Sequence, residues 1–412
     1  EAGRDLPVIG PDDAPPPAAL PATGGEPNAD TEAAVLYTSG TTGSPKGCVL
    51  TNTYFTHCGA WYRGMGGLCA LEDGAERMLT PLPLFHMNAL ACSVMAMLAT
   101  GGCLIVLDRF HPRSWWASVR DSRATCIHYL GVMPPMLMGA PESEADRDHA
   151  VRFGFGAGVP GDLHAPFEAR FGFPLIEAWA MTETGAGGVI TAHEEPRHVG
   201  TACFGRTDAG VEARVVGDDG SEAGADEPGE LLVRRAGPDP RHGFFDRYLK
   251  DEVATEAAWK GGWLHTGDVV RRDAAGNFRF VDRKKNVIRR SGENIAAVEV
   301  EGALRAHPLI EEAGVAPVPD EVRGDEVFAL LVPSQPLDDP AAAADEINAW
   351  MLTRLAYYKA PGFIAFVEAL PVTATNKVQR AKLKDEASRL LAEGVAIDLR
   401  ATKKRPIKTR AA

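Results

Sequence analysis

Short apolar runs alternate with mixed segments through the first part of this 412-residue chain. Between residues 33 and about 175 the runs are AAVL, MLTPL, CLIVL, ATCIHYL, RFGFG and FPLIEAW, and the stretches between them have helical composition. Alternation of this kind predicts a layered α/β domain with largely parallel strands. We expect Asn52 to cap the helix after the first of these strands and Pro112 to lie in the first turn of another.

The pattern changes between about residues 205 and 281, where short strands alternate with Gly- and Asp-rich turns. The segments VEARVV, GELLVRR, DVVRRD and NFRFVD are typical of antiparallel hairpins. After residue 285 the pattern predicts a small α+β domain, with helices at about 297–306 and 341–355 and from Arg380, and strands at EEAGVAPV, EVFALLVP and FIAFVE. The expected division is a Pro-rich irregular segment 1–32, a large domain 33–284, a small mobile domain 285–395 and a basic tail 396–412.

Composition narrows the class of protein. A hydrophobic content of 45% with 24% charged residues is typical of a globular chain, and no apolar run approaches the ~20 residues of a membrane span. The net charge of −13 argues against nucleic acid as the main partner. Seven cysteines without a CxxC pair fit reduced thiols, so we expect a cytoplasmic protein. The basic end KKRPIKTR is expected to be a solvated tail.

The segment YTSGTTGSPKG, residues 37–47, has the chemistry of a phosphate-binding loop. Glycines let backbone N–H groups approach phosphate oxygens, hydroxyls donate hydrogen bonds, and a lysine supplies positive charge. Pro45 stands where a Walker loop needs glycine, so a different phosphate-binding family is indicated, with an ordinary surface loop as the alternative. The candidate nucleotide-binding residues here are Thr38, Ser39, Gly40, Thr41, Thr42, Gly43 and Lys46.

This loop resembles the phosphate-binding signature of the adenylate-forming superfamily, which includes acyl-CoA synthetases, adenylation domains and luciferase-type enzymes. Further segments similar to that family's motifs follow in the family's order: AWAMTET after GFGAGVP, then GWLHTGD, then FRFVDRKKNVIRRSGEN, and finally LPVTATNK. The family carries a sizeable part of its large domain before the loop. The chain, which opens at Glu1, is therefore expected to be an N-terminally truncated member.

The resemblance implies roles for residues of the large domain. Trp179 would stack on adenine beside the backbone of Gly156 and Ala157, Thr182 and Glu183 would serve phosphate and Mg²⁺, Asp268 would accept the ribose hydroxyls, and Arg283 would contact the nucleotide. The first of these segments departs from the family, because Trp179 replaces the usual Tyr or Phe and Ala180 replaces Gly. Without the resemblance, AWAMTET would be read as ordinary core.

Other implied roles concern the acyl group and the small domain. Lys285 would be the hinge, Arg289 and Gly292 would face coenzyme A, and Lys377 would hold the substrate carboxylate against the α-phosphate, with Asn376 in place of the family's glycine. The family also suggests His86 as a gate beside the acyl pocket. A histidine at an apolar helix start is alternatively a packed core residue.

The expected function is that of an AMP-forming acyl-CoA synthetase with ATP, Mg²⁺ and coenzyme A as cofactors. It would activate a small-molecule carboxylate as an acyl-adenylate and then transfer the acyl group to coenzyme A, with a homodimer as one candidate assembly. The sequence looks most like crotonobetaine or carnitine-CoA ligases. The alternatives are an adenylation domain that loads a carrier protein and a non-catalytic nucleotide-binding fragment, and the acid itself is not identified by the sequence.

Overall fold

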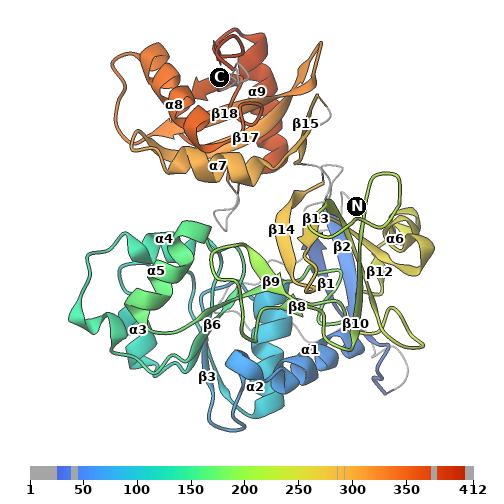
Figure 1. The fold of residues 1–412 in the computed structure, drawn as a ribbon. Helices are drawn as coiled ribbons and strands as arrows, with labels where there is room; N and C mark the ends of the chain where they lie inside the picture. The colour runs from blue at the N-terminus through green and yellow to red at the C-terminus, as the bar shows by residue number, and fades with distance from the viewer. Residues whose placement is uncertain (1–25, 39–44, 285, 292, 373–377, 404–412) are drawn as a thin grey trace, which may run out of the picture.

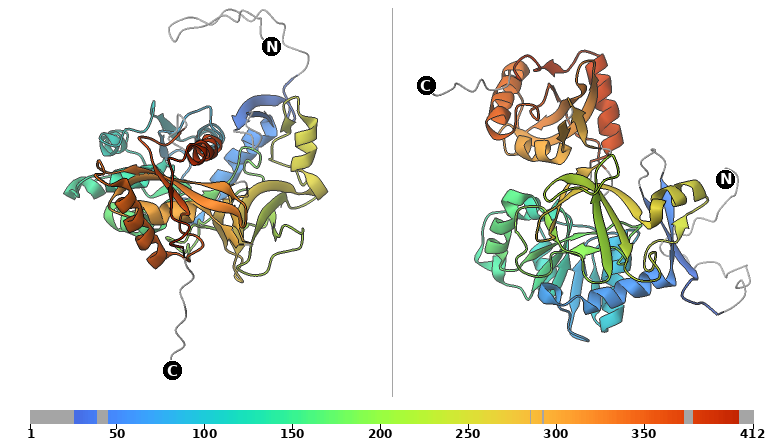
Figure 2. Two further views of the ribbon diagram at one scale, coloured as in Figure 1. Left: turned by 90° about the horizontal axis from the view of Figure 1, so that it is seen from above. Right: turned by 45° about the vertical axis from the view of Figure 1, so that its right-hand side comes forward.

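The computed structural model describes residues 26–38, 45–284, 286–291, 293–372 and 378–403. The ribbon forms two lobes, a large one that ends near residue 284 and a small one that follows it (Figure 1). Figure 2 shows the small lobe against one end of the large lobe, on the side of its antiparallel strands. Each lobe has its own buried clusters of apolar side chains.

The first sheet of the large lobe has the order β4-β3-β5-β6-β7-β8 and is parallel except for β8, as the alternating pattern predicts. Its strands are β3 (Arg77–Thr80), β4 (Cys103–Val106), β5 (Cys126–His128), β6 (Phe153–Gly156), β7 (Leu175–Trp179) and β8 (Ile190–Thr191). The associated helices are α1 (Asn52–Gly64), α2 (Met95–Thr100), α3 (Trp115–Asp121), α4 (Met133–Met138) and α5 (Gly161–Phe171). The π-helix η2 (Asn88–Val94) leads directly into α2.

Two expected helix starts are wrong by one to three residues. Asn52 is the first residue of α1 rather than its cap, because its side chain donates to the carbonyl of Asn28 at 2.8 Å instead of capping the helix. Helix α3 begins at Trp115, after Pro112. The contact with Asn28 also shows that the end of the segment 1–32 packs against the large lobe.

A second, three-stranded sheet in the large lobe has the order β1-β2-β12. Strands β1 (Glu32–Thr38) and β2 (Lys46–Thr51) flank the phosphate-binding candidate, and β12 (Arg247–Tyr248) pairs with β2, followed by α6 (Glu252–Ala258). Lys46 is therefore the first residue of a strand, not part of the loop itself. The sheet brings Tyr248 beside the phosphate-loop strands although about two hundred residues separate them in the sequence.

The third sheet of the large lobe is antiparallel, in the order β10-β11-β13-β14-β9, and confirms the predicted hairpins. The strands are β9 (Cys203–Gly205), β10 (Val211–Val216), β11 (Pro228–Arg235), β13 (Leu264–Arg272) and β14 (Phe278–Arg283). Short 3-10 turns occur at η1 (Gly67–Cys69), η3 (Glu144–Arg147) and η4 (Lys260–Gly262).

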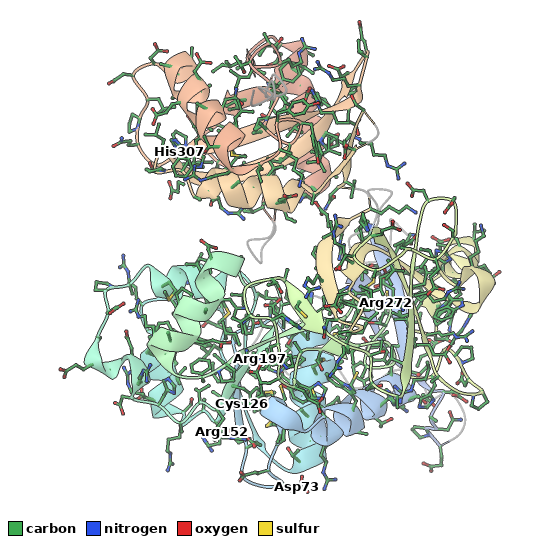
Figure 3. The ribbon with its side chains drawn as sticks, viewed as in Figure 1. Asp73, Cys126, Arg152, Arg197, Arg272 and His307 are labelled. Carbon is green, nitrogen blue, oxygen red and sulfur yellow. The ribbon has the colours of Figure 1, made fainter. Side chains whose placement is uncertain are left out.

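Arg197, labelled in Figure 3, forms a bidentate pair with Glu168 at 2.6 and 2.9 Å, and this structural ion pair lies inside the large lobe.

The small lobe confirms the predicted α+β pattern. Its sheet runs β16-β15-β18-β19-β20, and β17 pairs with β18. The strands are β15 (Ile288–Arg290), β16 (Glu293–Ile295), β17 (Ile310–Asp320), β18 (Gly324–Pro333), β19 (Phe363–Phe366) and β20 (Ile397–Asp398), and the helices are α7 (Ala297–Arg305), α8 (Pro340–Arg354) and α9 (Arg380–Ala392). Both faces of β18 are buried, one in the cluster under α7 and α8 and the other under α9, which explains its continuous apolar run FALLV.

The expectation of a solvated tail is wrong where the tail begins. Strand β20 pairs with β19, and the side chain of Lys403 is fully buried with its Nζ 2.5 Å from Oε1 of Glu326. Burial lowers the pKa of Lys403 to about 8, although Glu326 opposes the shift. Residues 396–403 thus belong to the fold of the small lobe.

Within the described ranges, no helix is long and apolar enough to cross a membrane. All seven cysteines are free thiols, and six of them are buried.

Candidate functional site

The candidate adenine site lies where neighbouring parallel strands end. Gly156 is the last residue of β6 and Trp179 the last of β7, and the two strands pair with Gly156 opposite Glu177. The carboxyl ends of adjacent parallel strands are where open α/β sheets place their ligands. A Cβ on Gly156 would lie 2.3 Å from the carbonyl oxygen of Tyr129, so the close approach of this loop requires glycine, while Ala157 is exposed.

Three predicted nucleotide-binding side chains meet at this edge. The indole Nε1–H of Trp179 donates to Oδ2 of Asp268 at 2.9 Å, and Nε of Arg283 lies 3.3 Å from Oδ1 of Asp268. Asp268 pairs with Arg283 across β13 and β14, which fixes the second contact through the sheet. The structure thus brings Trp179, from the first sheet, together with Asp268 and Arg283 of the antiparallel sheet.

Asp268 is a buried acid with capacity to accept further donors. Its side chain is 4% exposed, and Oδ1 has no hydrogen-bond partner among the described residues. Burial raises the pKa of Asp268, while Arg283 and the indole of Trp179 act in the opposite direction. An acceptor oxygen of this kind suits the hydroxyl groups of a ribose.

Glu183, the candidate metal ligand, lies in the turn after β7 and is buried. Its Oε1 accepts hydrogen bonds from Tyr248 Oη at 2.9 Å and from Thr38 Oγ1 at 3.4 Å. The adjacent Thr182 accepts a hydrogen bond from Tyr54 through its backbone carbonyl, at 3.0 Å. Lys46 Nζ lies 4.8 Å from the centroid of the Tyr248 ring. The flanks of the phosphate loop and the acidic motif are therefore neighbours.

The donor set fits magnesium held mainly through a nucleotide. No group of three or more His, Cys, Asp and Glu side chains in the described part of the chain could hold a metal ion by itself. Mg²⁺ is usually bound through one or two carboxylates together with substrate phosphates and water. The Glu183 carboxylate accepts from the neutral hydroxyls of Tyr248 and Thr38, so it has the chemistry of such a single carboxylate.

His86 is exposed and lies in a bend just before η2, so the packed-core alternative is wrong. Its Nδ1 accepts a hydrogen bond from the backbone N–H of Asn88 at 3.3 Å. Behind this segment His128 is fully buried, with Nδ1 2.6 Å from Asn88 Oδ1 and Nε2 2.9 Å from Tyr62 Oη. These contacts anchor the π-helix that follows His86, and π-helical turns are frequent at functional sites.

Glu177 is a supporting residue that sequence reasoning missed. Its carboxylate accepts hydrogen bonds from the backbone N–H groups of Gly158 at 2.9 Å and Val159 at 3.0 Å, and from Tyr129 Oη at 2.9 Å. The loop after β6 is thereby tied to β7. A charged residue inside the apolar strand run LIEAW is the signal that could have identified it, since such a residue needs buried partners.

The remaining predicted site residues are placed only in part. Arg289 lies on β15 of the small lobe, and its Nη2 is 2.8 Å from Oδ2 of Asp218 in the turn after β10. Its side chain is 56% exposed, so this contact joins the two lobes at their surface. Outside the described residues lie Ser39, Gly40, Thr41, Thr42, Gly43, Lys285, Gly292 and Lys377.

Comparison with known proteins identifies the family. Residues 6–239 match the AMP-binding enzyme family, and residues 299–377 match the AMP-binding enzyme C-terminal domain. The chain is 36% identical over 403 residues to the sulfoacetate–CoA ligase of Cupriavidus necator, covering 94% of this chain and 75% of that relative. It is 31% identical over 356 residues to the crotonobetaine/carnitine–CoA ligase of Citrobacter koseri, covering 86% of this chain and 67% of the relative.

A solved structure gives the same result for the fold. The o-succinylbenzoate CoA synthetase of Bacillus subtilis, in complex with its acyl-adenylate intermediate, matches with a TM-score of 0.73 and 30% identity, covering 87% of this chain and 70% of that one. The sequence-based resemblance and the α/β fold class are confirmed. With its large lobe and its C-terminal lobe both matched, the chain belongs to the AMP-binding enzyme family.

Proposed function

We propose that this protein is an ATP-dependent, AMP-forming acid–thiol ligase that makes an acyl-CoA thioester. The observation that supports this most directly is the convergence of Trp179, Asp268 and Arg283 at the carboxyl end of β7, next to Glu183. Family membership and the names of the relatives, which are CoA ligases, agree with it.

The first half-reaction forms an acyl-adenylate and releases pyrophosphate. Asp268 accepts the ribose hydroxyls, Trp179 and the loop at Gly156 and Ala157 face the base, and Arg283 meets ribose or phosphate oxygens. Lys46 and the loop of residues 38–43 hold the phosphates that leave. Glu183 and Thr182 would hold a magnesium ion, which would offset phosphate charge when bound.

Lys377 is proposed to hold the substrate carboxylate against the α-phosphate during this half-reaction. A fixed positive charge at that point stabilises the negative charge that develops in the transition state. His86 is proposed to stand at the entrance of the acyl pocket, consistent with its exposure in front of η2.

The second half-reaction transfers the acyl group to the thiol of coenzyme A, with AMP as the leaving group. We propose that the small lobe turns about Lys285 between the two steps, which removes Lys377 and brings Arg289 and Gly292 toward coenzyme A. The ion pair between Arg289 and Asp218 would then break and re-form as the lobes move.

Further proposals concern the substrate acid, the cellular compartment and the oligomeric state. The relatives act on sulfoacetate and on crotonobetaine or carnitine, so a screen of carboxylic acids should begin with short acids that carry a second charged group. We propose a cytoplasmic location, because ATP and coenzyme A are available there and the cysteines are free thiols. A homodimer is the assembly to test by light scattering.

The central experiment measures pyrophosphate release and CoA consumption with a panel of carboxylic acids. We expect both signals to require ATP and one acid. Lys377→Ala should abolish adenylate formation and still convert a supplied acyl-adenylate to thioester, and an equal loss in both assays would contradict its role. Asp268→Asn should weaken ATP binding by about tenfold or more, since a charge-assisted acceptor is lost.

Two alternatives give different results in the same assay. An adenylation domain for a carrier protein would release pyrophosphate but leave coenzyme A unused, and would load a phosphopantetheinylated carrier instead. A non-catalytic nucleotide-binding chain would bind ATP without pyrophosphate release for any acid. Either result would replace the proposed ligase function.

A further inference from the structure

Tyr248 occupies a fixed position beside the phosphate-loop strands. Strand β12 pairs with β2 so that Tyr248 lies opposite Cys48, two residues from Lys46. The backbone N–H of Tyr248 donates to Oγ1 of Thr255 at 2.9 Å, and the next residue, Leu249, donates to the carbonyl of Gly47 at 2.7 Å. The backbone is therefore held on both sides of the tyrosine side chain.

The Tyr248 side chain contacts two charged groups of the proposed site at once. Its hydroxyl donates to Oε1 of Glu183 at 2.9 Å, and its ring lies 4.8 Å from Nζ of Lys46. A lysine ammonium within ~6 Å of an aromatic centroid is attracted to the ring. One side chain thus joins the acidic motif after β7 to the lysine after the phosphate loop.

The choice of a hydroxyl donor has a chemical consequence. A lysine or arginine in place of the phenol would neutralise Glu183 and compete with a bound cation, whereas a neutral donor orients the carboxylate and leaves its charge intact. The second donor, Thr38 Oγ1 at 3.4 Å, is neutral as well and reaches the same Oε1 atom.

We propose that Tyr248 is a positioning residue that orients Glu183 for the magnesium of Mg·ATP and, through its ring, places Lys46 against the phosphates. The inference rests on the proposed function, because it assumes that Glu183 and Lys46 face a magnesium–nucleotide complex. Tyr248 lies outside every motif identified in the sequence, and its role follows from the pairing of β12 with β2.

The test separates the hydroxyl from the ring by direct binding. ATP affinity of the full chain is measured by calorimetry with excess Mg²⁺ and again with EDTA, for the wild type, Tyr248→Phe and Tyr248→Leu. Phe keeps the ring, so Y248F should lose about fivefold to tenfold in affinity with Mg²⁺ and stay within about twofold of wild type in EDTA. Leu removes the ring as well, so Y248L should lose affinity in both conditions.

Two controls exclude a merely structural effect. Tyr62→Phe also removes a buried hydroxyl, one that contacts His128, and should leave both affinities unchanged. In the Glu183→Gln background, Y248F should have no further effect on the Mg²⁺-dependent affinity, because the two residues act through one contact. Thermal unfolding of each variant verifies that it folds.

The outcomes distinguish this inference from the proposed function. Equal Mg²⁺ dependence in Y248F and wild type, or additive effects of Y248F and E183Q, would overturn the inference while ligase activity stands. A selective loss in Y248F without pyrophosphate release by wild type for any acid would support the inference and overturn the ligase function. Failure of the wild type to bind Mg·ATP would overturn both.

Discussion

The indole Nε1–H of Trp179 donates a hydrogen bond to Oδ2 of Asp268 at 2.9 Å. This contact gives a reason for tryptophan at a position where the family usually has Tyr or Phe. Trp179 faces the proposed adenine site, and its polar edge reaches the carboxylate proposed for the ribose. The side chains proposed to contact the base and the ribose of a nucleoside would therefore also be hydrogen-bonded to each other.

Trp179→Phe should weaken ATP binding by about tenfold at pH 7, because Asp268 loses a donor that stabilises its charged form. The same loss raises the pKa of Asp268 beyond its already raised value, so affinity should fall at a higher pH than in wild type as the solution is acidified. Calorimetric titrations between pH 5 and 8 measure both effects. Trp116→Phe, remote from Asp268, is the control, and coincident pH profiles for W179F and wild type would refute the coupling.

Glu177 should be important for both stability and binding. Glu177→Ala leaves the N–H groups of Gly158 and of the buried Val159 without their acceptor, which should cost about 2–4 kcal/mol of the free energy of unfolding. Tyr129→Phe removes one hydrogen bond to the same carboxylate and should cost about 1 kcal/mol. Urea denaturation measures the two costs. ATP affinity should fall more in E177A, and equal effects of the two variants would argue against Glu177 as the anchor of the loop.

His128 predicts a specific dependence of stability on pH. Burial lowers the pKa of His128 to about 3, so between pH 6.5 and 3 the unfolded chain binds a proton there that the folded chain does not. The contribution of His128 to the free energy of unfolding is complete above pH 6.5. It is lost as the pH falls, by up to about 1.4 kcal/mol per pH unit for one group. His57, with its pKa lowered to about 4, acts in the same direction.

His128→Gln should remove one of these contributions, and the free energy of unfolding should then fall less steeply between pH 6.5 and 4.5. Denaturation curves at four or five pH values are sufficient to compare the slopes. The matched control is His111→Gln, because His111 is 40% exposed. A slope unchanged from wild type would mean that His128 is protonated in the folded protein or titrates equally when unfolded.

The buried ion cluster of the small lobe predicts unequal effects for its members. Glu326 accepts from Nε of Arg290 at 2.9 Å and from Lys403, and all three side chains are at most 4% exposed. Glu326→Ala leaves two buried cations unpaired and should cost about 3–5 kcal/mol. Lys403→Met leaves Glu326 paired with Arg290 and should change stability by less than about 1 kcal/mol.

Thermal or urea unfolding of these two variants tests the cluster. An equal loss of stability in K403M and E326A would contradict this prediction, because Lys403 would then be an essential partner of Glu326. The lowered pKa of Lys403 favours the predicted result, since it reflects the cost of burying the ammonium group. Arg389→Met, at an exposed pair with Glu386, is a control that should lie within about 0.5 kcal/mol of wild type.

Much of the fold could be predicted because its signals are local. The apolar runs became strands, the Gly- and Asp-rich turns became hairpins, and the helices of the small lobe begin within a residue or two of the expected positions. The errors at Asn52 and Lys403 share one cause. In each case a polar side chain that local rules place in a cap or a solvated tail finds a tertiary partner instead, Asn28 or Glu326.

The sequence pattern predicted some residues of the proposed site and missed others, for a similar reason. Asp268 and Trp179 lie in segments whose order of residues is distinctive by itself. Tyr248, Glu177 and His128 act through partners that are distant in sequence, and a single Tyr, Glu or His does not form a recognisable motif. Only the ionisable residues inside the strand runs LIEAW and ATCIHYL indicated that buried partners must exist.

Periodicity, turn chemistry and motif spacing are properties of neighbouring residues, so they were enough to predict the family, the order of strands and helices and the residue types proposed for nucleotide binding. Three contacts depend instead on the tertiary structure: that of Trp179 with Asp268, that of Tyr248 with Glu183 and Lys46, and that of the buried Lys403 with Glu326. Sheet pairing and burial set these contacts. Both bring together groups that are far apart along the chain, and in a buried site each polar atom must find its partner there.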